Sequence, residues 1–297
     1  MTMKMKQLPI LRIRHLLTLL LLGFAAFAAQ ASAEADTAEV ERPVTSMFMV
    51  DAGHNSLLDT YVSAVTYRGV NVRLGYERMQ AMKFNPRKWV MQLEAGVDYS
   101  HLHNPAGNHT EHALMVEARW GMMHRWTDVG TQGLQLQLGG MTQFRGGIIY
   151  TPINSNNVVS VKLHWCVGLS ALAAYTVNRD GRVPVTLRYQ ATLPVAGVFY
   201  SPEYDESYYE IYLGNRKGLA NFGWWGNRFD MTNLLTADLH LGATVLRFGY
   251  RCRIANSWIK QINCHDITHG FVLGVGGEWL SLSRRKAAQR HTIGAIY

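Results

Sequence analysis

The sequence has few cysteines, few prolines and no long apolar segment beyond its first thirty residues. It contains three cysteines and eight prolines among 297 residues. No two cysteines form a C-x-x-C pair, which excludes a thiolate zinc or redox motif of that type. After residue 33 the longest apolar stretch, 165–175, is short and is broken by a glycine and a serine. A membrane-spanning helix needs about 20 apolar residues, so this part of the sequence predicts none.

Charge of either sign is also sparse. Charged residues make up 17% of the chain, and its formal net charge is +8. Residues 1–33 hold four of the cations and no acid, which leaves +4 for the rest. A charge this small and dispersed does not indicate a nucleic-acid partner.

The N-terminus has the features of an export signal. Lys4 and Arg14 are among four early cations, residues 16–29 are mainly apolar, and Ala31-Ser32-Ala33 fits a cleavage site. We expect a signal peptide over 1–33 and therefore contact with the export machinery, followed by a flexible periplasmic lead over 34–43. The alternative is an uncleaved anchoring helix, but the apolar run is shorter than a spanning helix needs.

What the chain does have is alternation. From Trp89 to Tyr99, apolar residues alternate with small or polar ones, which predicts a β-strand with one apolar face. The pattern recurs almost to the end of the chain. The predicted strands are 44–51, 66–79, 89–100, 112–126, 134–146, 158–176, 184–199, 229–240, 243–255 and 268–281.

These strands predict an all-β fold, an antiparallel transmembrane β-barrel over residues 44–282 with about ten strands. An exported chain without apolar helices can span a membrane only as a closed barrel. A soluble β-sandwich would show the same alternation, but long strands ending in aromatic residues favour the barrel. We expect twelve strands instead if 207–213 also spans the membrane and the C-terminal tail adds another strand. Residues 283–297 are interpreted as a basic C-terminal tail.

The barrel interpretation carries predictions about location and partners. We expect a monomer in the outer membrane of a Gram-negative envelope, surrounded by lipid and inserted by the barrel-assembly machinery. Short connections are predicted in the periplasm and long ones outside. The predicted long connections are 52–65, 101–111, 147–157, 200–228 and 256–267.

The predicted inner face is rich in charge of both signs. Mixed charges in a narrow barrel indicate a self-paired filling, and open water channels belong to much larger barrels, so a general porin is not expected. The predicted inward residues are Arg73, Glu77, Glu94, Asp98, Glu117, Arg119, Lys162, His164, Arg188, Asp238, His240, Arg247, Arg251 and Glu278.

Three predicted loops could carry catalysis or metal binding. His54, Ser56 and Asp59 are the residue types of an acyl-transfer triad, although adjacent residues rarely meet that geometry and a polar turn is the alternative. In the segment 101–112, His101, His103, His109 and His112 could converge on zinc or copper. In the connection 200–228, Glu203 and Asp205 are among the oxygen donors that suit calcium or another divalent cation. Otherwise we expect no cofactor. The alternatives are ordinary loop histidines and a packed lid.

Cys252 and Cys264 flank a predicted hairpin loop. In an oxidising compartment they could form a disulfide, whereas Cys166 lies within a predicted strand and is interpreted as a small packing residue.

Three segments resemble a family of uncharacterised outer-membrane proteins of Bacteroidota-type bacteria, known as a domain of unknown function. They are LLDTYVSAVTYRG (57–69) with VRLGYERM (72–79), PVTLRYQATLPVAGVFYSPEYDESYYEIY (184–212) and THGFVLGVGGEWLSL (268–282). The resemblance implies an exported barrel, and it implies no activity and no site residue.

The sequence therefore leaves three functions open. The first is a non-enzymatic role in binding or envelope organisation through the external loops. The alternatives are an outer-membrane lipid acyl hydrolase or acyltransferase, and a narrow transporter of a small apolar ligand.

Overall fold

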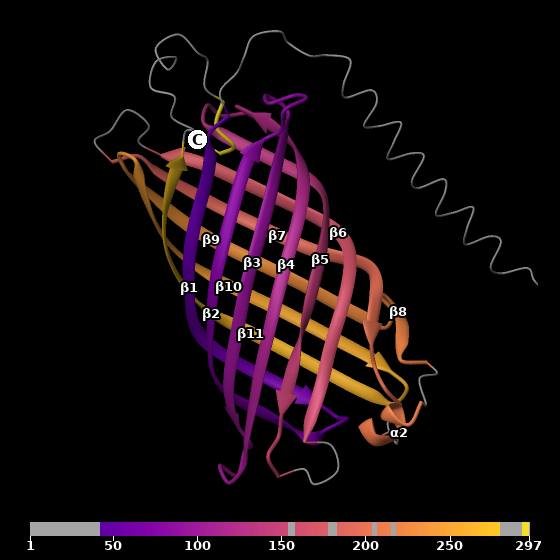
Figure 1. The fold of residues 1–297 in the computed structure, drawn as a ribbon. Helices are drawn as coiled ribbons and strands as arrows, with labels where there is room; N and C mark the ends of the chain where they lie inside the picture. Colours follow the sequence, from indigo (N-terminus) through magenta and orange to yellow (C-terminus); the bar gives the residue numbers. More distant parts are fainter. Residues whose placement is uncertain are drawn as a thin grey trace, which may run out of the picture.

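The computed structural model describes residues 42–153, 158–177, 183–203, 207–214, 218–279 and 293–296. The predicted signal peptide, residues 34–41 of the lead, Asp205 and residues 283–292 of the tail lie outside the described residues. Ten long strands form a tilted, closed barrel (Figure 1). The strands are β1 (Val44–Asp59), β2 (Ser63–Ala81), β3 (Trp89–His103), β4 (Thr110–Thr127), β5 (Leu134–Tyr150), β6 (Val159–Val177), β7 (Val185–Tyr200), β9 (Arg228–Leu241), β10 (Thr244–Ile259) and β11 (Ile262–Trp279).

The ring closes because β1 pairs with both β2 and β11, and all neighbouring strands are antiparallel. The predicted class and the count of ten are confirmed, and the twelve-strand alternative is wrong. The segment 207–213 does not span the barrel wall. It forms the short helix α2 (Tyr208–Tyr212), and a further short strand, β8 (Ala220–Trp224), pairs only with the end of β7. No helix among the described residues is long and apolar enough to cross a membrane.

A capping box starts α2. The Ser207 hydroxyl accepts from the Glu210 backbone N–H, while the Ser207 backbone N–H donates to the Glu210 carboxylate at 2.7 Å. The Glu210 carboxylate accepts hydrogen bonds from the backbone N–H of Ser207 and from its hydroxyl. Both bonds lower the pKa of Glu210 below its usual value, and the backbone bond has the larger effect.

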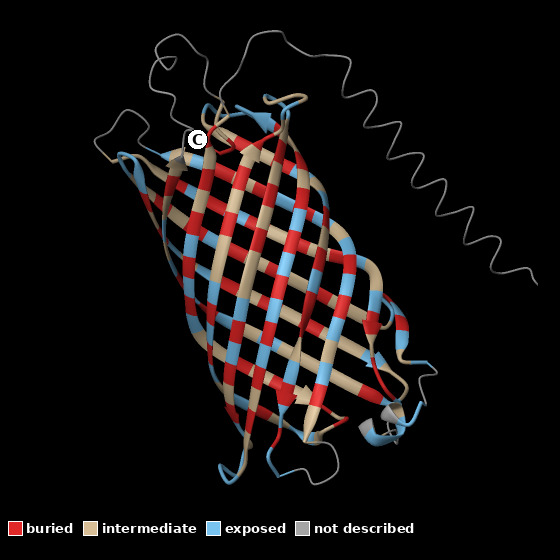
Figure 2. Cartoon of the chain, in the orientation of Figure 1, coloured by how far each residue is buried: buried red, intermediate tan, exposed pale blue. Residues whose placement is uncertain are grey.

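The two faces of the wall are inverted relative to a soluble protein. In β2, Asn71, Arg73 and Glu77 are buried inside, whereas Val70 and Leu74 are exposed outside. The same alternation of buried and exposed bands runs along every strand (Figure 2). A β-sandwich would bury the apolar set, so that alternative is wrong.

We call the end of the barrel near Val44 and Trp279 the terminal end, and the end that carries α2 the loop end (Figure 1). The long connections predicted at the loop end are mostly wrong. Strands β1, β3, β10 and β11 continue through residues assigned to loops, and the β10–β11 turn is only Lys260 and Gln261. Polar residues near these strand ends resemble loop composition, although their backbones are paired. Only the connection 201–227 is long.

Strand β7 contains a bulge that accommodates a proline. Gly168 pairs with Pro194 but Val167 pairs with Ala196, which leaves Val195 as the extra residue. A bulge is one of the few places where a sheet tolerates proline.

The interior has three layers. Buried apolar side chains lie near the loop end, among them Leu57, Leu102 and Ile149. Another apolar group, including Met79, Val90 and Met123, lies near the terminal end. The charged side chains occupy the space between them.

Candidate functional site

The interior charges form a connected network of ion pairs. Every residue that the alternation predicted to face inward lies on the inner face of its strand. Glu94, whose side chain is 1% exposed, accepts from Arg73 at 3.3 Å and from Arg251 at 2.8 Å. It also pairs with Arg119. Three guanidinium groups therefore surround one carboxylate.

A second group centres on Glu77. Its Oε2 accepts from Arg188 at 2.8 Å and from Arg247 at 2.6 Å. Arg247 also makes a two-pronged contact with Asp238, with both N–O distances 2.7 Å. Buried charges are tolerated when they are paired in this way. The predicted self-paired filling is confirmed.

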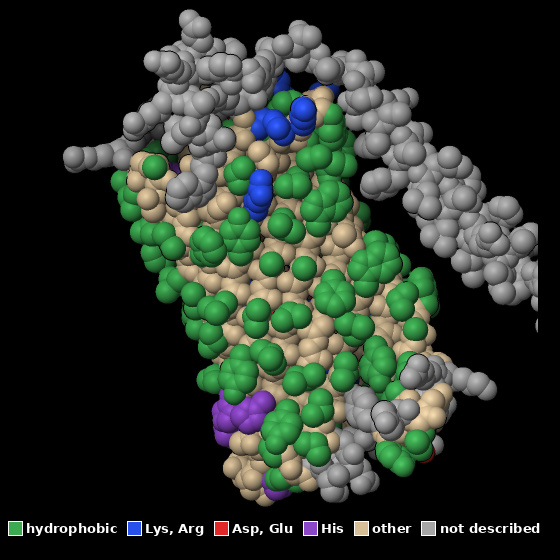
Figure 3. All heavy atoms as spheres, viewed as in Figure 1, with side chains coloured by type: hydrophobic (Ala, Val, Ile, Leu, Met, Phe, Trp, Pro, Cys, Tyr) green, Lys and Arg blue, Asp and Glu red, His purple; other side chains and the backbone are tan. Residues whose placement is uncertain are grey.

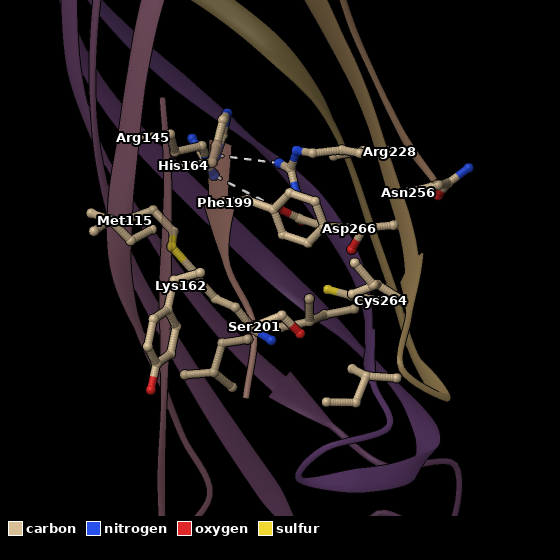
Figure 4. Close-up of a pocket in the computed structure, with 18 of the residues that line it drawn as sticks. Met115, Arg145, Lys162, His164, Phe199, Ser201, Arg228, Asn256, Cys264 and Asp266 are labelled. Carbon is tan, nitrogen blue, oxygen red and sulfur yellow. Dashed lines mark hydrogen bonds and ion pairs between the residues drawn. The ribbon is translucent and has the colours of Figure 1, made fainter. Parts of the chain in front are cut away.

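Between this network and the loop end lies a small cavity of about 60 Å³. That volume has room for a few water molecules. Its lining includes one carboxylate, that of Asp266, and four cations: Arg145, Lys162, Arg228 and Arg253. Figure 4 shows Arg145, His164 and Arg228 on one side, with Lys162, Ser201 and Cys264 on the other.

Arg228 and His164 contact each other at one side of this cavity. Arg228 Nη2 lies 3.2 Å from His164 Nδ1, and its guanidinium lies 5.4 Å from the centroid of the Phe199 ring. Because Arg228 can only donate, His164 Nδ1 is the acceptor. The buried His164 Nε2 has no hydrogen-bond partner among the described residues; Asp230 is 3.8 Å away. The cavity thus offers donors at a largely cationic surface.

The opposite, terminal mouth of the barrel contains residues 293–296 of the chain. Ala295 is fully buried and Ile296 is nearly so. Beside them is a larger cavity of about 520 Å³, lined in part by Arg125, Gln135 and His240. The sequence placed these residues in a periplasmic tail, and nothing in their spacing indicated that they enter the barrel.

The predicted metal-binding histidines gather only in part, and they lie on the outer wall. The His101 and His112 rings have centroids 4.8 Å apart, and those of His101 and His103 are 4.7 Å apart. His109 is in the β3–β4 turn. Within the described ranges, no three His, Cys, Asp or Glu residues are arranged to hold a metal ion. Glu203 is exposed, and the nearest described cation is Lys260 at 3.7 Å.

Arg68 extends this cluster, since it is opposite His103 in the β2–β3 register. We call Arg68, His101, His103 and His112 the histidine patch. Figure 3 shows histidines gathered at the loop end of a wall that is mainly apolar. At the outward positions of the ten barrel strands there is no Asp or Glu. The patch is therefore a local concentration of donors and positive charge.

The predicted catalytic residues are not in a loop. His54, Ser56 and Asp59 all belong to β1. His54 and Ser56 lie on the outer face, whereas Asp59 is buried inside with Lys162 at 2.7 Å. The barrel wall separates Asp59 from the other two, so the structure does not assemble the predicted triad.

The predicted disulfide is also wrong. All three cysteines are free. Cys252 is opposite His269, and Cys264 is opposite Ser257, so the two are far apart in the register. Cys252 faces outwards and Cys264 faces the loop-end cavity.

The comparisons with known proteins give a family and distant structural similarities. Residues 15–286 match the family described as "Protein of unknown function (DUF3316)". No curated protein matches the sequence. The translocator domain of the autotransporter NalP from Neisseria meningitidis is 11% identical with a TM-score of 0.37, covering 88% of this chain and 97% of that domain.

Two further structures are similar at this level. The β-domain of the Bordetella autotransporter BrkA is 8% identical with a TM-score of 0.34, over 80% of this chain and 99% of that one. An outer-membrane channel from Pseudomonas putida F1 is 8% identical with a TM-score of 0.31, over 83% and 98%. At these values the similarities carry no argument about this chain.

Proposed function

The chain belongs to the DUF3316 family of proteins of unknown function, and from its structure we propose that it is a monomeric outer-membrane barrel that conducts no solute and acts by binding at its loop end. The family resemblance inferred from the sequence is confirmed, while the bacterial group named with it stays a prediction. The proposal requires no cofactor.

The outer wall supports the membrane location. Phe48, Leu74 and Trp165 are among the many apolar side chains exposed on it, and a wall of this kind is stable in lipid. With the predicted export signal, the terminal end would face the periplasm and the loop end the outside. Insertion by the barrel-assembly machinery is part of the same proposal.

The observation that carries the proposed function is the filled interior. The Glu94 and Glu77 networks join β2, β3, β4, β7 and β10 across the lumen. A solute would have to break several buried ion pairs to pass, and breaking one such pair costs about 3–5 kcal/mol. This argues against the transporter alternative and directs attention to the ends of the barrel.

At the loop end, the chemistry of the cavity favours a small anionic ligand. Arg228 and Arg253 face it together with His164 Nε2, which has no hydrogen-bond partner in the described part of the chain. Asp230, 2.8 Å from Arg253, holds that guanidinium in place. An anionic group could accept from these donors without displacing the network below.

The outer wall supports a role in envelope organisation as well. The histidine patch lies at the loop end of the outer wall. On the same strands, apolar side chains such as Val97 and Leu114 follow it towards the middle of the wall. Lipid phosphates occupy the corresponding boundary between headgroups and acyl chains. Arg68 would supply the fixed positive charge, and the imidazole N–H groups would donate to phosphate oxygens.

One experiment with two parts tests the proposed function. Purified protein in a planar bilayer should show no ion conductance. In the second part, inorganic phosphate should bind the wild type in a calorimetric titration, and Arg228→Gln should weaken this binding about tenfold.

Lys88→Gln, an exposed change at the terminal end, serves as the control for phosphate binding. Stable single-channel steps from the wild type would disprove the closed lumen. Phosphate binding that is equal in wild type and Arg228→Gln would remove the loop-end cavity as the site.

A further inference from the structure

Residues 293–296 of the chain lie in the terminal mouth, where the barrel contacts both their side chains and their backbone. Ala295 and Ile296 pack with apolar side chains that come from four different strands. Those side chains are Met79 of β2, Val90 of β3, Met123 of β4, and Leu172 and Ala174 of β6. The segment therefore completes an apolar layer that the barrel wall alone leaves open.

The backbone of the segment is bound as well as its side chains. Arg125 Nη1 donates to the carbonyl oxygens of Gly294 at 2.6 Å and Ala295 at 3.3 Å. The Ala295 carbonyl also accepts from the side-chain amides of Gln135 at 3.0 Å and Gln137 at 3.2 Å. Three side chains from β4 and β5 thus converge on one peptide group.

Arg125 differs from the other interior arginines. Each of the arginines in the ion-pair network has a carboxylate partner, for example Arg73 with Asp98 at 2.9 Å. In the part of the chain that the structure describes, Arg125 makes no ion pair, and its partners are carbonyl oxygens. Besides those of the C-terminal segment, they belong to Pro86 at 2.6 Å and Arg87 at 3.1 Å.

This arrangement makes Arg125 a recognition group for main-chain carbonyls. The β2–β3 connection orients its guanidinium through Pro86 and Arg87, and the remaining donor capacity points to the segment. A buried guanidinium is costly unless its donors are satisfied, and the carbonyls of Gly294 and Ala295 satisfy the Nη1 group of Arg125.

We propose that the terminal mouth is a peptide-binding site, with Arg125, Gln135 and Gln137 as its polar contacts and the apolar layer as its side-chain pocket. Its occupant is residues 293–296 of the same chain. The ligand class is a short apolar peptide that offers adjacent backbone carbonyls. Occupancy closes the lumen at the end opposite the loop-end cavity, independently of what that cavity binds.

The test separates the peptide from the barrel. A chain that ends at Thr292 should bind a fluorescent synthetic peptide with the sequence of residues 291–297, HTIGAIY, in detergent solution. The full-length chain should bind it at least tenfold more weakly because its own segment occupies the site. Introducing Arg125→Met into the truncated chain should weaken binding at least tenfold, whereas the exposed change Lys83→Met should not.

Equal binding by the truncated and full-length chains would overturn the proposal, as would binding that is insensitive to Arg125→Met. Because the truncated chain could fail to fold, a second measurement uses the full-length protein. With the native cysteines replaced by serine, Ala295→Cys should react with a maleimide at least tenfold more slowly than Lys83→Cys. Equal rates would show that the segment is not held in the mouth.

Discussion

At the scale of single residues, the distribution of carboxylates has the largest consequences. They lie inside the barrel, and none lies on the outer faces of its ten strands. Glu77 illustrates the energetic result. It is 3% exposed and pairs with both Arg188 and Arg247. Because the carboxylate belongs to a network, its contribution to the free energy of unfolding differs from that of one isolated ion pair.

Glu77→Gln should therefore be strongly destabilising although the side chain keeps its shape. The change removes a negative charge but leaves two buried guanidinium groups facing a neutral amide. We expect the free energy of unfolding to fall by about 3–5 kcal/mol. A urea titration of the detergent-solubilised protein, followed by the fraction of folded band on a gel, measures the loss.

Glu203→Gln, which changes an exposed carboxylate outside the network, is the matched control and should change stability by less than about 0.5 kcal/mol. Combining Glu77→Gln with Arg247→Met should cost less than the sum of the two single changes, because the double variant removes both members of a pair. Strict additivity would contradict the network.

The inward position of these residues could be predicted from the sequence, but their partners could not. Alternation places Arg73 and Glu94 on the same face of neighbouring strands, so their proximity follows once the register is known. The contact of Glu77 with Arg188 joins residues 111 positions apart. It depends on the tilt and closure of the whole barrel, which alternation does not specify.

At the scale of elements, the strands are longer than their apolar patterns. His101 and His103 continue β3 beyond its last apolar outward residue, and in β1 the outward His54 and Ser56 interrupt the apolar pattern before Leu58. Polarity there reflects the end of the lipid-facing belt and not the end of the strand. That is why the ten strands could be predicted while the loops that were thought to carry catalysis could not.

The β10–β11 turn shows what such a tight connection costs. Both of its residues have positive φ, Lys260 at 50° and Gln261 at 65°. Residues with a Cβ disfavour this region, whereas glycine enters it freely. Lys260 also donates to the Gly218 carbonyl at 2.6 Å, so Gln261 is the better position to change.

Gln261→Gly should stabilise the protein by about 1 kcal/mol, because it relieves the unfavourable backbone conformation. Gln261→Ala keeps the Cβ and should give no such gain. Urea titration of the three proteins under identical conditions decides the matter. A loss of stability with glycine would mean that the Gln261 side chain makes a contribution larger than the strain.

At the scale of the whole molecule, the outer wall is apolar with cationic or imidazole groups near its ends. Arg68 lies at the loop end and Arg78 near the terminal end. Such a wall should respond to the charge of the surrounding lipid, and the histidine patch should carry most of that response at the loop end.

Phosphatidic acid mixed into phosphatidylcholine vesicles should stabilise the wild type by about 1 kcal/mol relative to phosphatidylcholine alone. Most of this gain should be absent from the variant Arg68→Gln/His101→Asn/His103→Asn/His112→Asn. Unboiled samples on a detergent gel give the folded fraction, since a closed barrel runs as a compact band until it is denatured.

His124→Asn is a single change near the terminal end that leaves the histidine patch intact, and this variant should still be stabilised by phosphatidic acid. If the four-residue variant is stabilised to the same extent, the patch does not contact lipid phosphate. Stabilisation by free inorganic phosphate, which we propose binds the loop-end cavity, should be equal in the wild type and the four-residue variant, because the predicted lipid contact is with a headgroup held at the wall.

The paired interior also limits the order in which the barrel can be built. Some buried charges have partners on strands that are distant in the sequence. Arg251 of β10 pairs with Asp51 of β1 at 2.7 Å, although the two residues are 200 positions apart. A lone hairpin crossing the membrane would expose such charges to hydrocarbon, at about 2.5–3.5 kcal/mol or more for each. Insertion strand by strand is thereby disfavoured, and β1 and β10 must come together before, or while, the polar face leaves water.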